Sequence, residues 1–375
     1  MGLVAGAVFT LSAGFVVYVL VVYPLLVAAL ARWRPRPVLS APIQPGVSVI
    51  LAVHNGERWL ERKLESILAL DYPRELLEVI VVSDGSTDST EDIAARYVPR
   101  GIRLVRIPRQ GKWAAINAGI AAATREILFF TDVRQTLERA SLRRLVAAFA
   151  DPTVGVASGG LVIREGDTEE EASTGLYWRY EKWIRVRQSR VDSVLGATGA
   201  IYAMRRELAA PLPPDTLLDD VHLPMGAFVR GYRLVLDESA RAFDEPSSLD
   251  TEFRRKVRTL AGIYQLIGAY PVLLTPANRM WLHFLSHKFG RLLLPFALIL
   301  CAASALFLDS PWSEWLLAGQ AAFYLAAALD LVVPRSSSLK RLTTPVRTFV
   351  VMMVAAVCAT RILFAPAREL WKPAA

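Results

Sequence analysis

The chain is poor in cysteine and in recognisable nucleic-acid-binding motifs. Its 375 residues include two cysteines, Cys301 and Cys358, and both fall within apolar runs. The sequence therefore predicts neither a disulfide framework nor a zinc site. There is no internal repeat and no low-complexity segment. The net charge is +8, yet no basic and aromatic recognition motif accompanies it, which argues against nucleic-acid binding.

Charged residues are also missing from the beginning of the chain. None occurs between Met1 and Arg32, and the chain is 53% hydrophobic, too apolar for a purely soluble protein. The run is longer than the apolar part of a signal peptide, and no positive charge precedes it. Residues 1–34 are therefore predicted to form a retained transmembrane helix. Arg32, Arg34 and Arg36 follow it and place that end in the cytoplasm.

Three further apolar runs lie near the end of the chain: Leu292–Leu308, Trp315–Leu329 and Phe349–Phe364. Arg361 interrupts the last of them, so a re-entrant or interfacial helix is an alternative to a third span there. Residues 291–375 are predicted to be a C-terminal transmembrane region of two to three helices. The side on which the chain ends stays open. The surplus of positive charge fits contact with anionic lipid.

The middle of the chain alternates between strand and helix patterns. Buried-strand runs occur at Val47–Val53, Leu77–Val82 and Ile127–Phe130, and Glu57–Leu70 has helical spacing. A further helix is expected from about Ser89. Such alternation predicts an α/β domain, over about residues 46–250, with a mostly parallel sheet and helices on both faces. Ligands of such sheets bind beyond the carboxyl ends of the strands.

Polar residues follow these strands. Asp84, in VVSDGSTDST, ends the second strand, and Asp132, in ILFFTDVRQ, ends the third, with Arg134 two residues later. Glu57 closes the HNGE cluster after the first strand, and Lys112 opens a helix in RQGKWAAINAG, a context that suits an anion. Taken alone, these residues fit a turn, a helix cap or solvated surface better than a binding site.

The ordered set of motifs is more specific than its parts. VSVILAVHNGE, VVSDGSTD, GKWAAINAGI and FFTD follow one another, and GATGAIYAMRREL, LLDDVHLPM and EFRRKVRTLAG come later. Together they resemble family 2 glycosyltransferases, the membrane-bound group that includes cellulose, hyaluronan and chitin synthases. The resemblance covers about residues 46–290 and the flanking spans. It implies a GT-A fold, a cytoplasmic catalytic domain at the cell or plasma membrane, and a nucleotide-diphosphate sugar, commonly a UDP sugar.

The resemblance also implies roles for individual residues. Glu57 and Asp84 would contact the nucleoside, and Lys112 would lie near the base or the diphosphate. Asp132 matches the first acid of the family's D-x-D motif, which reaches the ribose, the diphosphate or its metal, Mg²⁺ or Mn²⁺. The second acid is replaced by Arg134. We expect Asp132 still to ligate metal, with Arg134 supplying either positive charge or a structural ion pair.

Catalysis is expected at LLDD, where Asp220 matches the family's base and Asp219 precedes it. A base is needed because an inverting transfer removes the acceptor's hydroxyl proton as that oxygen attacks the anomeric carbon. Repulsion from Asp219 would raise the pKa of Asp220. Two acids at the start of a helix also fit a purely structural reading, as complements to the helix dipole. The small residues of GATGAIYAMRREL suit either close passage of an acceptor or a tight turn and buried strand.

A second departure from the family lies in EFRRKVRT. Processive synthases carry Q-x-x-R-W near this position, where the chain has Arg255, Arg258 and Thr259. Arg258 would still reach the diphosphate, but the missing tryptophan weakens the case for processive polymerisation. The apolar spacing in this segment also predicts an amphipathic helix on the membrane surface, within interfacial helices over residues 251–290.

These observations predict a membrane-integrated, inverting glycosyltransferase that acts on a growing polysaccharide or a lipid-linked acceptor. The alternative is a non-catalytic sugar-nucleotide-binding membrane protein or partner subunit, in which Arg134 marks lost metal chemistry. A solute transporter would need more spans and some repeat symmetry, neither of which the sequence has.

Overall fold

The computed structural model describes residues 2–163, 169–245, 249–334 and 337–370. The chain divides into two compact units, which are described separately. The sheet unit comprises Trp33–Arg164 and Arg185–Pro246. The helical unit comprises Met1–Arg32, Glu165–Ile184 and Ser247–Ala375.

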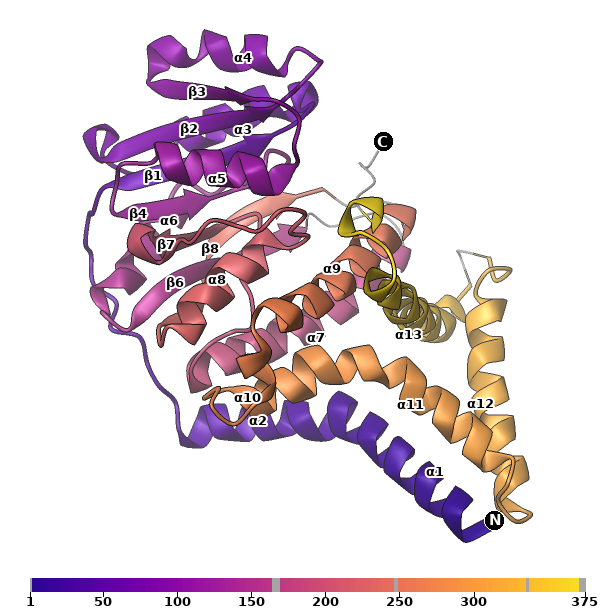
Figure 1. Cartoon of the computed structure of the whole chain (residues 1–375). Coiled ribbons are helices and arrows are strands. Elements are labelled where there is room, and N and C mark those ends of the chain that lie inside the picture. The colour runs from indigo at the N-terminus through magenta and orange to yellow at the C-terminus, as the bar shows by residue number, and fades with distance from the viewer. Residues whose placement is uncertain (1, 164–168, 246–248, 335–336, 371–375) are drawn as a thin grey trace. The chain divides into compact units, whose positions relative to one another are not determined.

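The sheet unit is built on an eight-stranded sheet within the described residues, with strand order β3-β2-β1-β4-β7-β6-β8-β5 (Figure 1). The strands are β1 (Val47–Val53), β2 (Leu77–Asp84), β3 (Ile102–Ile107), β4 (Ile127–Phe130), β5 (Thr136–Leu137), β6 (Val154–Ile163), β7 (Tyr202–Arg205) and β8 (Arg233–Asp244). β1 to β4 are parallel neighbours, and β6 runs parallel to β8. Only β7 and the short β5 pair antiparallel with their neighbours. The predicted mixed α/β fold with a mostly parallel sheet is confirmed.

The three strands predicted from the sequence are present. β1 and β4 have the predicted bounds, and β2 continues two residues beyond its apolar run to Asp84. β1 lies between β2 and β4, with Val53 opposite Ser83 and Ile50 opposite Phe130. Since these strands run in the same direction, their carboxyl ends reach one edge of the sheet. The residues that follow them therefore gather at that edge.

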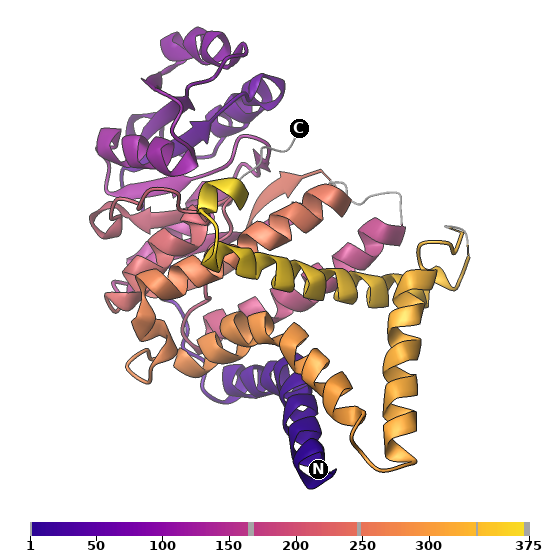
Figure 2. The same cartoon turned by 45° about the vertical axis from the view of Figure 1, so that its right-hand side comes forward.

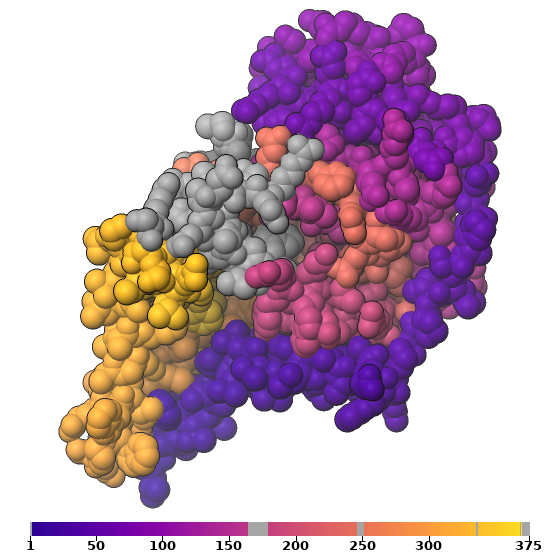
Figure 3. Space-filling model, turned by 180° about the vertical axis from the view of Figure 1, so that it is seen from behind, coloured from indigo at the N-terminus to yellow at the C-terminus, as the bar shows by residue number. Residues whose placement is uncertain are grey.

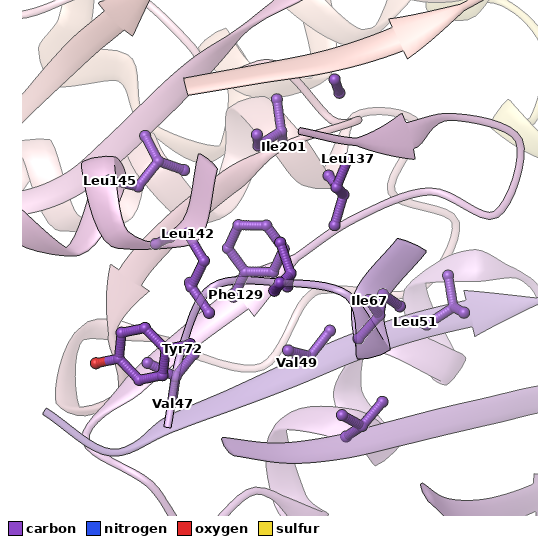
Figure 4. Packing of buried hydrophobic residues seen from close by; sticks show 14 of the residues in the cluster. Val47, Val49, Leu51, Ile67, Tyr72, Phe129, Leu137, Leu142, Leu145 and Ile201 are labelled. Atoms are coloured by element: carbon purple, nitrogen blue, oxygen red, sulfur yellow. The ribbon is translucent and has the colours of Figure 1, made fainter. Parts of the chain in front are cut away.

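Helices cover both faces of this sheet, as predicted. Val49, Leu51 and Phe129 point to one face, where they form a core with residues of α3 (Glu57–Leu68) and α6 (Ser141–Ala147) (Figure 4). Ile50 and Val82 point to the other face, because successive side chains of a strand alternate. There α5 (Lys112–Ala122) approaches so closely that a Cβ on Gly119 would lie 2.5 Å from Cγ2 of Ile50. Two further helices of this unit are α4 (Thr90–Arg96) and α8 (Asp219–Val229).

The helical unit contains three helices that are long and apolar enough to cross a membrane by length and composition, among the described residues. They span Gly2–Trp33, Trp281–Ala305 and Lys340–Leu363. The first is continuous through α1 (Gly2–Val17), a π-helical segment at Tyr18–Val22 and α2 (Tyr23–Trp33), and α1 packs along α11 (Gly290–Ala305) (Figure 1). Much of this first helix lies at the surface seen in Figure 3, with exposed side chains that include Leu3, Leu11 and Leu25.

The remaining helices of this unit are α7 (Glu169–Val191), which continues into the sheet unit, α9 (Leu249–Ala269), α10 (Trp281–His283), α12 (Trp312–Leu329) and α13 (Lys340–Ala359). Figure 2 shows α12 meeting α13 after leaving the end of α11. α12 contains the apolar run Trp315–Leu329 but falls outside the three candidate spans. The run that Arg361 interrupts, Phe349–Phe364, lies largely within the third candidate span.

Candidate active site

Asp84 organises the loop that precedes α5. Its carboxylate is buried at the end of β2, where it accepts hydrogen bonds from the backbone N–H groups of Gln110, at 2.8 Å, and Gly111, at 2.9 Å. The guanidinium of Arg109 pairs with the same carboxylate. Gly85 has a φ of +58°, and a Cβ there would lie 2.6 Å from the backbone nitrogen of Arg109. The D-G pair thus holds the loop tightly against the strand end.

Glu57 joins two loops at the same edge of the sheet. Its side chain is exposed at the start of α3, and its Oε2 accepts a hydrogen bond from the backbone N–H of Ser89 at 3.0 Å. Its own N–H donates to Oδ2 of Asp88 at 3.1 Å. This reciprocal pair fixes the loop after β1 to the loop after β2. The predicted contact of Glu57 and Asp84 with a nucleoside stays a prediction.

Lys112 brings together two of the predicted acids. It is the first residue of α5, and its Nζ lies 2.8 Å from Oδ1 of Asp132 and 3.0 Å from Oδ1 of Asp219. Burial disfavours the ammonium, but the charges of Asp132, Asp219 and Asp220 outweigh that effect and raise the pKa of Lys112. The lysine is therefore a protonated bridge between the loop after β4 and the first residue of α8.

Asp220 is held by the loop that leads into β7. Its Oδ2 accepts a hydrogen bond from the N–H of Gly199 at 3.1 Å, and its backbone carbonyl accepts one from Ala197 at 2.8 Å. A Cβ on Gly199 would lie 2.9 Å from that Oδ2, so any larger residue would force the carboxylate to shift. Both LLDD acids thus lie at the edge where Lys112 and Asp132 meet. Asp219 is paired with the lysine ammonium, which offsets its repulsion of Asp220.

The partner of Arg134 is a carboxylate of the chain and not a diphosphate. Its guanidinium pairs with Asp244, a buried residue at the end of β8, and Nε2 of Gln135 donates to Oδ2 of the same carboxylate at 2.9 Å. Of the two roles expected for Arg134, the structure supports the structural ion pair. Arg134 and Asp244 neutralise one another, so Asp132 is the acid that this loop presents to the shared edge.

The described residues supply few ligands for a divalent ion at this site. No group of three or more His, Cys, Asp or Glu side chains that could hold a metal occurs among the described residues. Asp132 offers one carboxylate, which is partly exposed. Mg²⁺ and related ions are commonly held by one or two carboxylates together with substrate phosphates and water. Asp132 suits such an arrangement, with diphosphate oxygens as the further ligands.

Arg255 and Arg258 lie on α9, in the helical unit, and are described only within it. Nη2 of Arg255 pairs with Oε2 of Glu252 at 2.8 Å, one helical turn earlier. The hydroxyl of Thr259, which stands at the family's tryptophan position, donates to the carbonyl of Arg255 at 2.8 Å. The predicted reach of Arg258 to a diphosphate, and substrate binding by Arg255, stay predictions.

Three residues that sequence reasoning did not single out lie around the cluster. Lys63 of α3 is fully buried, and its Nζ donates to Oγ1 of Thr131 at 2.5 Å and to the carbonyl of Gln135 at 2.6 Å. In the sequence, Lys63 could have been recognised by its position on the apolar stripe of α3. Arg185 donates to Oγ1 of Thr198 at 3.2 Å and to the carbonyl of Gly196 at 3.1 Å, and so braces the GATG loop.

The third is Tyr202, the first residue of β7. Its side chain is fully buried, and its ring stacks on Phe130 of β4 with 4.7 Å between centroids. Its hydroxyl has no hydrogen-bond partner in the described part of the structure. Burial, together with the charges of Asp219, Asp220 and Asp132, raises the pKa of Tyr202, so the hydroxyl stays protonated. The sequence offered only a tyrosine in a buried strand.

Comparison with known proteins identifies the family. The model of "Glycosyl transferase family 2" matches residues 48–211, and that of "Glycosyl transferase family group 2" matches residues 134–330. The probable glycosyltransferase YdaM of Bacillus subtilis is 26% identical over 58% of this chain and 55% of its own length. The poly-beta-1,6-N-acetyl-D-glucosamine synthase of Staphylococcus aureus is 22% identical over 62% of this chain and 58% of its own. The chain thus spans little more than half the length of these curated relatives.

A solved structure matches nearly the whole chain. The mannosyltransferase PcManGT of Pyrobaculum calidifontis, determined in complex with GDP-Man and Mn²⁺, superposes with a TM-score of 0.73 at 25% sequence identity. The match covers 97% of this chain and 99% of the other. The fold of the sheet unit is therefore the GT-A fold, as the resemblance implied. On these matches the chain belongs to the family 2 glycosyltransferases and is an enzyme of that family.

Proposed function

We propose that the chain is a membrane-integrated, inverting glycosyltransferase. It transfers a sugar from a nucleotide-diphosphate sugar to a hydroxyl of a growing polysaccharide or of a lipid-linked acceptor. The observation that carries this proposal is the arrangement of Lys112, Asp132, Asp219 and Asp220 at the carboxyl edge of the parallel strands. It combines a cation and a carboxylate for a diphosphate with a second carboxylate placed to act as a base.

Asp220 is assigned as the catalytic base. The acceptor oxygen attacks the anomeric carbon of the donor, and its proton passes to the carboxylate of Asp220. The bond from that carbon to the diphosphate oxygen breaks, and its electron pair leaves with the nucleoside diphosphate. The hydrogen bond from Gly199 fixes the carboxylate as the proton is transferred. Attack opposite the leaving group inverts the anomeric centre.

Lys112 and Asp132 are assigned to the leaving group. The lysine is protonated, and its charge stabilises the negative charge that develops on the departing diphosphate. A divalent ion, Mg²⁺ or Mn²⁺, would be held by Asp132 and would supply Lewis-acid stabilisation of the same oxygens. The Mn²⁺ in the complex of PcManGT supports divalent metal use by this chain.

Two nucleotides are candidates for the donor. The family resemblance favours a UDP sugar, and the PcManGT complex, which matches almost the entire chain, contains GDP-Man. The nucleoside is assigned to Glu57 and Asp84 and to the loops that they fix, as the family resemblance implies. The donor class is therefore a nucleoside diphosphate sugar, with UDP and GDP sugars as the two arms of the test.

The acceptor is assigned to the membrane. Three helices that could cross a bilayer support membrane integration, with the sheet unit in the cytoplasm as the arginines after Trp33 indicate. Membrane-spanning helices could present an acceptor that is anchored by its lipid, or could let a growing polymer pass through the membrane. The named activity of the Staphylococcus aureus relative supports a polysaccharide acceptor, and the absence of the Q-x-x-R-W tryptophan favours a lipid-linked acceptor with single transfer.

Nucleotide release tests the proposal. The purified chain in detergent would be given UDP and GDP sugars, with membrane lipid extract, and with Mg²⁺, Mn²⁺ or a chelator. Asp220→Asn is the key variant, because it keeps the size of the side chain but removes the base. We expect release from one donor, with a loss of about 10²- to 10⁴-fold in kcat in the variant. Binding of UDP or GDP to the variant should be unchanged.

The outcomes separate the two functions. Release that survives Asp220→Asn would remove Asp220 from its assigned role. Nucleotide binding without release from any donor, in the presence of lipid extract and metal, would favour the non-catalytic sugar-nucleotide-binding protein.

A further inference from the structure

We propose that Lys112 is a displaceable internal cation that keeps divalent ions off Asp132 until a donor diphosphate is bound. In the free enzyme its ammonium joins Asp132 to Asp219. The diphosphate draws the ammonium away, and Asp132 then becomes a metal ligand. The inference deepens the proposed function and rests on it, because it takes the diphosphate of a sugar nucleotide as the displacing group.

The distances place the lysine where a metal would have to bind. Nζ of Lys112 is 2.8 Å from Oδ1 of Asp132 and 3.0 Å from Oδ1 of Asp219. A divalent ion on Asp132 would lie about 2.1 Å from a carboxylate oxygen. The ion and the ammonium would then be neighbours within a few ångströms, where like charges repel strongly away from bulk water. An ion at Oδ1 would take the place of the ammonium, and an ion at the second oxygen would be repelled by it.

The rest of the site offers a metal no compensation. Arg134 and Asp244 are committed to one another, and the described residues contain no three-ligand group for a metal. An ion that displaced Lys112 without a donor would gain at most the two carboxylates that the ammonium now joins, those of Asp132 and Asp219, and would lose much of its hydration. Diphosphate oxygens change this balance, because they provide ligands for the ion and a new partner for the ammonium.

The charges agree with such an exchange. Asp132, Asp219 and Asp220 bring three negative charges, which are partly offset by Lys112 and, at Asp220, by Arg185. A diphosphate that esterifies a nucleoside and a sugar brings two negative charges, and a divalent ion brings two positive ones. The ion and the donor entering together therefore leave the net charge of the cluster unchanged, whereas either alone shifts it by two.

Tyr202 provides the replacement partner for Asp219. Its hydroxyl is buried on the side of the sheet where α5 and α8 begin, and it has no hydrogen-bond partner among the described residues. The carboxylates of Asp219, Asp220 and Asp132 are the charges that act on it. When Lys112 moves to the diphosphate, Asp219 loses its ammonium, and we expect the unpartnered Tyr202 hydroxyl to turn to that carboxylate. Tyr202 is thus a positioning residue, which explains a buried hydroxyl that is otherwise costly to leave unpaired.

Mn²⁺ binding tests the exchange directly. Loss of the free Mn²⁺ signal in electron paramagnetic resonance would be followed for the full chain in detergent, without nucleotide and with UDP or GDP. We expect the wild type to bind Mn²⁺ only with nucleotide. Lys112→Met, of similar length but uncharged, should bind Mn²⁺ without nucleotide at least tenfold more tightly than the wild type. Lys112→Met combined with Asp132→Asn should lose that binding, and Arg96→Met, which removes an exposed cation, should behave as wild type.

Tyr202→Phe is the second variant, because it removes a hydroxyl and leaves every charge of the cluster in place. It should weaken nucleotide-dependent Mn²⁺ binding roughly tenfold, since Asp219 then has no partner to replace the lysine. The affinity for UDP or GDP without metal should stay the same, which a merely structural role for the tyrosine would not predict.

Several results would overturn the exchange. Wild-type binding of Mn²⁺ that is equal with and without nucleotide, alongside intact sugar transfer, would reject it and leave the proposed function in place. Nucleotide binding without any Mn²⁺ binding would also reject it, and Lys112 would then be a permanent cation. A wild-type chain that neither binds UDP or GDP nor releases nucleotide would reject the proposed function and this inference together.

Discussion

Lys63 should make the stability of the sheet unit depend on pH in the neutral to alkaline range. Its Nζ is fully buried, with Oγ1 of Thr131 and the carbonyl of Gln135 as hydrogen-bond acceptors. Burial lowers the pKa of Lys63 to about 7, against an opposing contribution from Asp132. An unfolded lysine titrates near pH 10.4. Folding therefore favours the neutral amine over a window of about three pH units.

The sign of the effect follows from proton binding. Between pH 7 and about 10 the unfolded chain holds a proton on Lys63 that the folded chain has released, so the free energy of unfolding rises with pH. From pH 7 to 9 the gain is about 2 kcal/mol, because each pH unit well above the folded pKa contributes about 1.4 kcal/mol. Lys63→Met keeps the length of the side chain and removes the titration. Any stability advantage of the variant over the wild type should shrink by that amount.

Thermal unfolding at a series of pH values measures this difference. The Tm of the full chain in detergent would be followed from pH 7 to 9 for the wild type, for Lys63→Met and for Lys182→Met, which changes an exposed lysine. The Tm of the wild type should rise by several degrees relative to that of Lys63→Met between pH 7 and 9, while Lys182→Met runs parallel to the wild type. A gap that is constant over the range would refute the argument, because Lys63 would then titrate as an ordinary lysine.

Two further substitutions test the site. Gly199→Ala would place a methyl group 2.9 Å from Oδ2 of Asp220. We expect kcat for nucleotide release to fall at least tenfold, with the affinity for UDP or GDP unchanged. An unchanged kcat would show that catalysis by Asp220 does not depend on this loop. Arg134→Asp restores the D-x-D motif but places a second carboxylate beside the buried Asp244. We expect the free energy of unfolding to fall by about 3 kcal/mol, measured through Tm. The Mn²⁺ dependence of nucleotide release should become no stronger, which a metal titration would show.

The parallel half of the sheet was predictable because its signals are local. β1, β2 and β4 are short apolar runs bounded by polar or turn-forming residues, and such runs identify a buried strand without any knowledge of its neighbours. Their shared direction then follows from the helices between them. These local signals are sufficient to place Asp84 and Asp132 at one edge of the sheet. β3, β6 and β8 were not predicted, and β6 meets β8 through two register shifts that no local pattern encodes.

The partners within the site were not predictable, because they depend on residues far apart in the chain. Arg134 meets Asp244 across more than 100 residues, and nothing in ILFFTDVRQ indicates which of its two expected roles the arginine takes. Lys63 is different, since a signal was present. Leu60, Lys63, Leu64 and Ile67 share one face of α3, and a lysine on an apolar stripe requires a buried acceptor. The sequence shows such a lysine but not its acceptors.

The loop after β4 explains how the family's chemistry tolerates the loss of an acid. Lys63 holds it at Thr131 and Gln135, and Asp244 holds it at Arg134 and Gln135. The other four residues from Thr131 to Gln135 are held by polar or apolar contacts. Asp132 is the residue of this loop that pairs with Lys112. A single carboxylate on a rigid loop is weak as a metal site by itself but sufficient as one ligand among phosphate oxygens. On the exchange proposed above, an arginine at the position of the family's second acid would leave the selection of the metal to the protein–donor complex, which is the arrangement that a displaceable Lys112 requires.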